Sequence, residues 1–131
     1  MNSLDVKDYL NQVRINDARV EILIKEKEDL ELRFEQILDN SRYKDILRQI
    51  QHKEDEINQA IDEYMNYREE VAKRILKLDN ALYMKILAKR YFEYKTFETI
   101  ASEIYVSVRH TTRLHGYALL AMARSMTDDG A

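Results

Sequence analysis

The chain has 131 residues and a formal net charge of −3, and it contains two glycines, no proline and no cysteine. The absence of cysteine excludes disulfides, thiolate metal sites and a cysteine nucleophile. No apolar run approaches the ~20 residues that a bilayer-spanning helix needs, and the N-terminus lacks the basic start and apolar stretch of a secretory signal. With neither kind of segment in the sequence, we expect a cytoplasmic protein. Because so few residues interrupt a helix, we also expect it to be built from long helices.

Charge is distributed unevenly along the chain. Residues 1–84 carry 14 Lys and Arg against 19 Asp and Glu, whereas residues 85–124 carry 7 against 3. The two stretches therefore have net charges of −5 and +4. A basic C-terminal stretch behind an acidic, helix-forming one is typical of a nucleic-acid-binding module attached to a solvated helical body.

The N-terminal segment predicts one amphipathic helix, with Ser3 as its N-cap and its end near Leu38. Its apolar residues form a broad stripe rather than a single seam, and they include Val6, Leu10, Val13, Val20, Ile24, Phe34 and Leu38. The next three residues, Asp39, Asn40 and Ser41, favour turns and caps. We therefore expect the first break in the chain at this point.

Residues 42–78 predict a second long helix with a heptad seam. Its members follow steps of four and three, with polar interruptions at Glu54 and Arg68. The seam comprises Tyr43, Leu47, Ile50, Glu54, Ile57, Ile61, Tyr64, Arg68, Val71, Ile75 and Leu78. Two long amphipathic helices joined by a short turn predict an antiparallel hairpin, or coiled coil, over residues 1–78.

Two interpretations of residues 1–78 stay open. The region can be purely structural, with each helix satisfying the other. Alternatively, the broad stripe serves both the hairpin and a second copy of the chain, because a lone helix pair leaves its apolar flanks in water. The second interpretation makes residues 1–78 an oligomerisation region and the protein a homodimer.

Three shorter helices are expected after residue 78. Asp79 is the expected N-cap of a helix over residues 81–92, whose buried side carries Leu82, Ile86, Leu87 and Tyr91. Thr96 is expected to cap a helix over 97–104, and Ser107 to cap a last helix over 108–124. The remaining residues, 125–131, are expected to be a frayed tail.

Residues 97–116 fit the helix-turn-helix pattern position by position. Ala101 supplies the small residue where the two helices cross, and residues 104–106 form the tight turn. The apolar residues that lock the pair together are Ile100, Ile104, Val106 and Leu114. We therefore expect residues 79–124 to form a three-helix DNA-binding domain, with helix 108–124 in the major groove of duplex DNA.

The expected contact residues lie at the start of that helix. Arg109 and Arg113 can make bidentate contacts to guanine or bind phosphate. The hydroxyls of Thr96 and Ser107 stand at helix N-termini, where phosphates are also favoured. The full set of expected DNA contacts is Thr96, Ser107, Val108, Arg109, His110, Thr112 and Arg113.

Three residues depart from the simple pattern. Tyr105 stands where helix-turn-helix motifs often carry glycine, so we expect a non-glycine residue at positive φ. Thr111 stands where an apolar residue usually packs, and we expect it to loosen the last helix. Gly116 lies inside a predicted helix, where we expect close packing against a neighbouring helix to explain it.

The stretch from Thr96 to Ser107, followed by Arg109, resembles region 4 of bacterial sigma factors. Over most of residues 6–120 the chain also resembles a family of small phage and prophage proteins of Gram-positive bacteria. The resemblance is carried by segments such as 8–13, 56–62, 90–101 and 113–119. It implies a transcriptional regulator with a sigma-region-4-like fold, related in kind to ArpU/RinA-type phage late regulators.

These observations predict an all-α, sequence-specific regulator that binds double-stranded DNA in a bacterial host cell and can contact host RNA polymerase. One alternative is the small subunit of a phage terminase, which would recognise a packaging site. Another is a sigma-like adaptor that binds RNA polymerase without binding DNA itself. No enzymatic activity or cofactor is expected. No metal site is expected either, since His110 and His115 are five residues apart and do not share a helix face.

Overall fold

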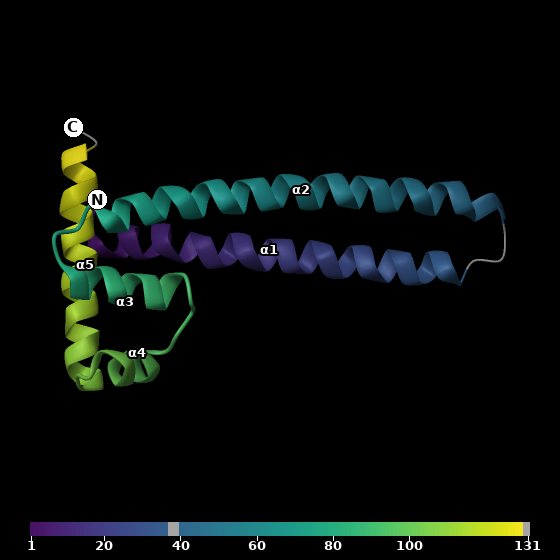
Figure 1. Ribbon diagram of the computed structural model, residues 1–131. Coiled ribbons are helices and arrows are strands. Elements are labelled where there is room, and N and C mark those ends of the chain that lie inside the picture. Colours follow the sequence, from purple (N-terminus) through teal and green to yellow (C-terminus); the bar gives the residue numbers. More distant parts are fainter. Residues whose placement is uncertain (37–39, 130–131) are drawn as a thin grey trace. The chain divides into compact units, whose positions relative to one another are not determined.

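The computed structural model describes residues 1–36 and 40–129, and these residues form five helices and no strand (Figure 1). The expected all-α class is confirmed. The helices are α1 (Ser3–Glu35), α2 (Asn40–Leu76), α3 (Ala81–Tyr91), α4 (Phe97–Ile104) and α5 (Val108–Asp129). None of them, over the described residues, has an apolar stretch long enough to span a bilayer. Leu38, the expected end of the first helix, and Asp39 lie outside the described residues, whereas Asn40 and Ser41, the other two residues of the expected break, belong to α2.

The chain divides into two compact units. Unit 1 comprises residues 1–14 and 67–131, of which 130 and 131 lie outside the described part, and unit 2 comprises residues 15–66. The first turns of α1 and the last turns of α2 therefore group with α3, α4 and α5. This division falls elsewhere than the boundary that the sequence suggested after residue 78.

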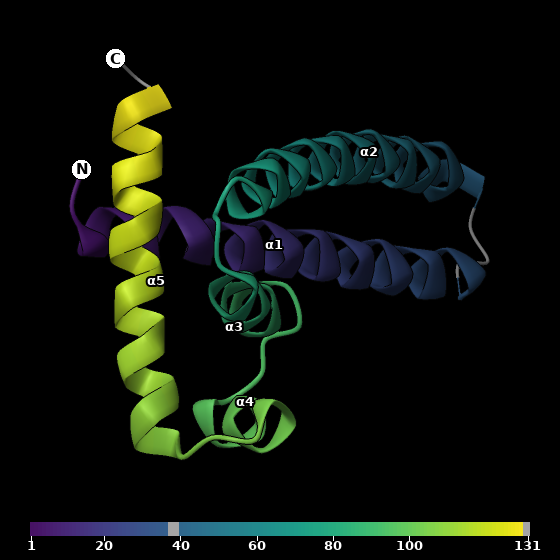
Figure 2. The same cartoon turned by 60° about the vertical axis from the view of Figure 1, so that its left-hand side comes forward.

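In unit 2, α1 and α2 run antiparallel. Arg19 pairs with Glu63 at 3.9 Å, and the rings of Phe34 and Tyr43 lie 5.0 Å apart. Residue numbers therefore rise along α1 as those of their partners fall along α2. The two helices lie side by side over this unit in both ribbon views (Figures 1 and 2).

The packed seam of α2 agrees with the predicted one only in part. The predicted members Tyr43, Leu47, Glu54, Ile61 and Arg68 are exposed, whereas Ile50, Ile57, Tyr64, Val71, Ile75 and Leu78 are buried or half-buried. The buried and half-buried positions of unit 2 are Asn16, Asp17, Val20, Leu23, Lys27, Leu30 and Phe34 in α1, and Ile46, Ile50, Lys53, Glu56, Ile57, Ala60 and Tyr64 in α2. The prediction placed Glu54 in the seam and missed Lys53, whose apolar stem packs while its ammonium group reaches a carboxylate.

Two half-buried lysines of unit 2, one on each helix, form a reciprocal pair of ion contacts. Lys53 Nζ of α2 lies 2.6 Å from Glu26 of α1, and Lys27 Nζ of α1 lies 3.3 Å from Glu54 of α2. In each lysine, the hydrogen bond to that carboxylate is the main cause that raises its pKa above the ordinary value. Exposed ion pairs add little free energy, but a shift in register would separate both pairs.

Unit 1 is built around α5. Figures 1 and 2 show α3 and α4 stacked along one side of this helix. Ile86, Ile100 and Leu114, one from each helix, form a buried cluster, against which Leu82, Tyr83, Phe97 and Ile104 pack. The ends of the long helices complete the unit, where Val6, Leu10, Val13, Val71, Ile75 and Leu78 are buried.

The caps of α4 and α5 are those that the sequence predicts. Thr96 Oγ1 accepts a hydrogen bond from the backbone N–H of Thr99 at 3.2 Å. Ser107 Oγ accepts one from the backbone N–H of His110 at 3.0 Å. Each cap satisfies a backbone donor that the first helical turn would otherwise leave without a partner.

Two other predicted caps are wrong by one residue. Asn80, not Asp79, caps α3, because its Oδ1 accepts from the backbone N–H three residues on at 3.0 Å. Asn2, not Ser3, caps α1. Asn2 Oδ1 accepts from the backbone N–H of Asp5 at 2.9 Å, and Asp5 Oδ2 accepts from that of Asn2 at 3.0 Å. This reciprocal arrangement uses two side chains where a serine cap would use one.

The last helix is longer than predicted. We expected fraying from residue 125, but α5 continues to Asp129, and only residues 130 and 131 lie outside the described part. Met126 is buried, and Thr127 Oγ1 donates a hydrogen bond to the Ala123 carbonyl at 2.8 Å. Burial of this last apolar residue stabilises a turn that the short sequence pattern could not indicate.

The turn between α4 and α5 holds Tyr105 in the left-handed region, at φ 62° and ψ 41°. The expectation of a non-glycine residue at positive φ is therefore confirmed. The backbone N–H groups of Tyr105 and Val106 both donate to the Ala101 carbonyl, which ends α4. The Tyr105 side chain is 94% exposed, so its packing does not offset the steric cost of this backbone conformation.

Replacing Tyr105 with glycine is expected to raise the free energy of unfolding by about 0.5–1 kcal/mol, because glycine adopts this conformation without strain. Tyr105→Ala keeps a Cβ atom and is the matched control, with no such gain expected. Urea denaturation of the three proteins measures the difference. A glycine variant no more stable than the alanine variant would show that the turn is unstrained.

Candidate nucleic-acid interface

The first two turns of α5 are exposed to solvent and are held by α4 and the turn that joins the two helices, which together we call the frame. Ile100 and Ala101 of α4 are buried, as is Leu114 of α5. Ile104 and Val106, on either side of Tyr105, are half-buried. The small side chain of Ala101 permits the close approach of α4 that its burial indicates, so the frame holds the start of α5 in a fixed direction.

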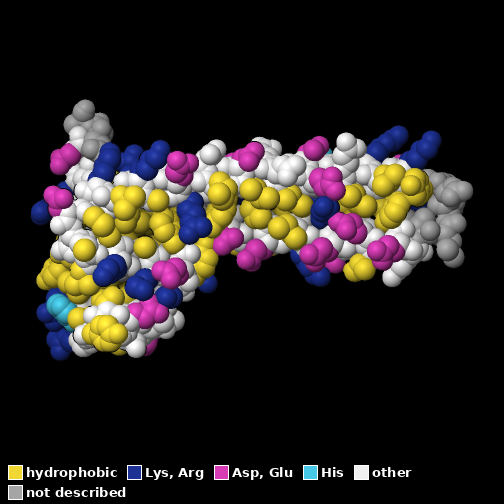
Figure 3. Space-filling view, in the orientation of Figure 1, with side chains coloured by type: hydrophobic (Ala, Val, Ile, Leu, Met, Phe, Trp, Pro, Cys, Tyr) yellow, Lys and Arg dark blue, Asp and Glu magenta, His cyan; other side chains and the backbone are white. Residues whose placement is uncertain are grey.

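Every predicted contact residue is exposed. Thr96 precedes α4, Ser107 precedes α5, and the other five belong to the first two turns of α5. Figure 3 shows Lys and Arg side chains around a histidine at the lower left, where α5 begins in Figure 1. The structure thus brings the predicted α5 residues together on one accessible end of the helix.

Some of these residues already form side-chain hydrogen bonds within the protein, and others do not. The hydroxyls of Thr96 and Thr112 donate to Thr99 Oγ1 and to the Val108 carbonyl, at 3.0 Å each, and Ser107 Oγ serves as a cap. Arg109 and Arg113, by contrast, form no ion pair or hydrogen bond with any side chain in the described part of the chain. Being four residues apart, they lie on the same helix face.

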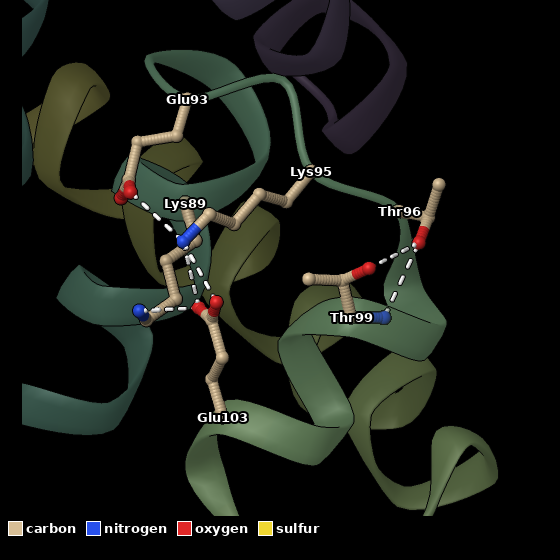
Figure 4. Close-up of polar contacts among 6 residues, drawn as sticks. All are labelled: Lys89, Glu93, Lys95, Thr96, Thr99 and Glu103. Carbon is tan, nitrogen blue, oxygen red and sulfur yellow. Dashed lines mark hydrogen bonds and ion pairs between the residues drawn. The ribbon is translucent and has the colours of Figure 1, made fainter.

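Other cations of residues 85–124 are engaged within the protein (Figure 4). Lys89 Nζ and Lys95 Nζ lie 2.7 and 2.8 Å from the carboxylate of Glu103, and Lys95 also lies 3.0 Å from Glu93. This cluster ties α3, the following loop and the end of α4 together. Sequence reasoning missed it, since Glu103 is 14 residues from Lys89 and no local spacing joins them.

The charges of this cluster are stabilised by its own hydrogen bonds. Those from Lys89 and then Lys95 hold the pKa of Glu103 below its ordinary value. Those to Glu103 and then Glu93 raise the pKa of Lys95. Lys95 and Glu103 therefore stay charged near neutral pH and neutralise each other.

Arg90 also has a structural role. Its guanidinium lies 4.4 Å from the centre of the Phe97 ring, and it donates a hydrogen bond to the Lys95 carbonyl at 2.9 Å. With Lys89 and Lys95 engaged as well, the positive charge that remains available to a ligand in α5 comes from Arg109, Arg113 and Arg124. Since Glu103 and Glu93 neutralise Lys89 and Lys95, the excess of four positive charges in residues 85–124 falls on the other cations of this stretch.

Thr111 does not loosen α5, and that expectation was wrong. Its side chain is fully buried, and its hydroxyl donates to the Ser107 carbonyl at 2.9 Å. The donor is satisfied inside the helix, so only the methyl group needs an apolar environment. Threonine therefore serves as a small core residue at this position.

A buried histidine supports α5 from behind. His115 Nε2 and the Tyr91 hydroxyl are hydrogen-bonded at 2.8 Å, and the two rings stack with their centres 5.7 Å apart. Burial, followed by the charges of Arg90 and Lys7, lowers the pKa of His115 to about 4. Burial raises the pKa of Tyr91 to about 12. Both groups are therefore neutral at physiological pH.

The described residues contain no group of three or more His, Asp or Glu side chains placed to hold a metal ion. Comparison of the chain with protein-family models, curated proteins and solved structures finds no match. Function must therefore be inferred from the geometry of unit 1 and unit 2.

Lowering the pH from about 6.5 to about 4 is expected to cost roughly 3 kcal/mol of stability through His115 alone. The unfolded chain binds a proton near pH 6.5 and the folded chain only near 4, so stability is complete above this window and falls within it. Thermal unfolding at several pH values measures the loss.

His115→Gln is the matched control, because glutamine keeps a polar partner for Tyr91 and cannot titrate. The variant is expected to lack the part of the pH dependence that lies between about 4 and 6.5. Parallel stability curves for the two proteins in this window would contradict the assignment.

Proposed function

We propose that the protein binds double-stranded DNA by inserting the first two turns of α5 into the major groove. The observation that carries the proposal is the pair Arg109 and Arg113, which are exposed, share one helix face and have no partner among the described side chains. An arginine in the groove can donate two hydrogen bonds to one guanine. An α-helix of ~10–12 Å diameter matches a groove about 12 Å wide.

The frame behind α5 supports this assignment. α4, the left-handed turn at Tyr105 and α5 have the order and the small crossing residue, Ala101, of a helix-turn-helix. α3 packs with α4 and α5 through Ile86, Ile100 and Leu114, and this packing supports the sigma-region-4-like arrangement that the sequence resemblance implies. The ion pairs of Lys89 and Lys95 with Glu103 hold the end of α4, and with it the direction in which α5 leaves the turn.

A sequence-specific regulator of phage type, acting alone or with host RNA polymerase, is the role that these features favour. Selection of bound sequences from a random duplex pool tests it, with a defined recovered motif as the expected result. Absence of any salt-sensitive duplex binding would favour the adaptor alternative. A ring-shaped oligomer by native mass spectrometry would favour the packaging alternative.

Replacing Arg109 or Arg113 with alanine is expected to weaken binding to the selected duplex by about 1–3 kcal/mol and to relax preference at one base position. Arg42→Ala, which removes an exposed arginine from unit 2, is the matched control and should bind like the wild type. Fluorescence anisotropy at fixed salt gives the affinities. A folded double variant, Arg109→Ala with Arg113→Ala, that binds with unchanged affinity would refute the assignment.

We further propose that unit 2 joins two copies of the chain. Of its described residues only Ile57 and Ala60 are buried, too small a core for two helices of this length. Ile24, Leu47 and Ile61 are 39%, 40% and 37% exposed, and each directly follows a packed seam position. They therefore lie on one flank of the antiparallel pair, which we call the apolar flank.

The two flanks of the pair have different chemistry. Arg19, Glu26, Glu56 and Glu63, each of which directly precedes a packed position, form ion pairs along the opposite flank. Figure 3 shows hydrophobic side chains in a row between α1 and α2, interrupted by a cation with acids beside it. A second copy offers the same apolar row at the same spacing, so mutual burial of the two flanks would complete a four-helix bundle.

Sedimentation at micromolar concentration is expected to give twice the 15.7 kDa mass of one chain. Ile61→Glu should shift the protein toward monomer, because dimerisation would bury an unpaired carboxylate. Gln59→Glu adds the same charge at an exposed position two residues earlier and should remain dimeric. A wild-type mass near one chain would rule out the dimer.

A further inference from the structure

Gly116 has no explanation within the chain. It lies in the interior of α5, where glycine is less favourable than alanine. Its φ is not positive, and a Cβ atom added to it would meet nothing within 4 Å. The close packing against a neighbouring helix that the sequence suggested is therefore absent, and neither backbone geometry nor intrachain packing requires a glycine here.

Its position relates Gly116 to the proposed DNA contacts. It follows Thr112 by four residues and Arg113 by three, so it shares their face of α5 one turn further on. At ~1.5 Å per residue, it lies about 10 Å along the helix from Arg109. This distance is close to the ~12 Å width of the major groove. A helix that reads bases near Arg109 therefore reaches a wall of the groove near Gly116.

The surroundings of Gly116 suit an anionic, hydrogen-bonding surface. Tyr117 is 49% exposed, and its hydroxyl forms no hydrogen bond within the described part of the chain. The first acidic side chain of α5 is Asp128, three turns beyond Gly116. From Val108 to Thr127, the exposed residues of α5 include arginines, hydroxyl groups and the apolar side chains of Val108 and Leu120, with no carboxylate to repel a phosphate.

We propose that Gly116 and Tyr117 contact the sugar–phosphate backbone where α5 leaves the major groove. Glycine lets the deoxyribose and phosphate approach the helix more closely than any side chain would allow. The Tyr117 hydroxyl donates a hydrogen bond to a phosphate oxygen. Such contacts set the depth and angle of α5 without reading sequence. The inference rests on the proposed DNA binding and names a further part of that interface.

The test is Gly116→Ala, which separates stability from binding. Alanine favours the helix and meets no atom, so the melting temperature should rise by several degrees. The methyl group should weaken duplex binding about three- to tenfold, by the same factor for the selected site and for a site with altered bases. Gly116→Leu should weaken binding at least tenfold, and Tyr117→Phe about twofold to fivefold, again independent of sequence.

Asn58→Ala is the matched control, since it raises helix propensity at an exposed position of α2 and should leave DNA affinity unchanged. A more stable Gly116→Ala protein with unchanged affinity would overturn the inference. A variant whose mass by sedimentation changes while its affinity does not would also overturn it, by assigning this face to a second copy. If the wild-type protein binds no duplex at all, the proposed function itself fails, which is a different result.

Discussion

The burial of one face of α5 is the constraint on which unit 1 depends. Leu114, Ala118, Leu119 and Met122 are buried along this face. His115 reaches Tyr91 from the same side of the helix. The position of a residue along a helix fixes the direction in which its side chain leaves the axis. Burial of these side chains therefore turns the positions of Arg109, Arg113 and Gly116 outward. The core and the candidate interface are thus two consequences of one packing arrangement.

Polar groups inside this unit are used to hold it together. Thr111 returns its hydroxyl to its own helix, and the neutral pair of His115 and Tyr91 satisfies two buried polar groups with each other. Lys89 and Lys95 are held by one carboxylate, Glu103. Few cations are therefore exposed at the N-terminal end of α5. Such a small set suits a short contact with a groove better than broad electrostatic attraction.

Unit 2 follows a different principle, because two helices alone cannot surround a core. Its register is marked by the exchange of Lys27 and Lys53 with acids of the opposite helix, and its two flanks differ in polarity. Under the proposed function, DNA binding through one short helix would gain from linkage to a second copy, since the second contact would form at high effective concentration. The apolar flank provides a physical route to that linkage.

The helical class, the order of the five helices, the caps at Thr96 and Ser107, and the left-handed turn at Tyr105 could all be predicted from the amino-acid sequence. These features depend on local spacing, capping groups and backbone sterics, which neighbouring residues dictate. Long-range packing, by contrast, sets which of two overlapping stripes of α2 is buried, where α5 ends and which lysines Glu103 neutralises. It also determines that Gly116 has open space beside it. Each of these depends on what lies across from a residue in space, and the nearest partner is often more than ten positions away in sequence.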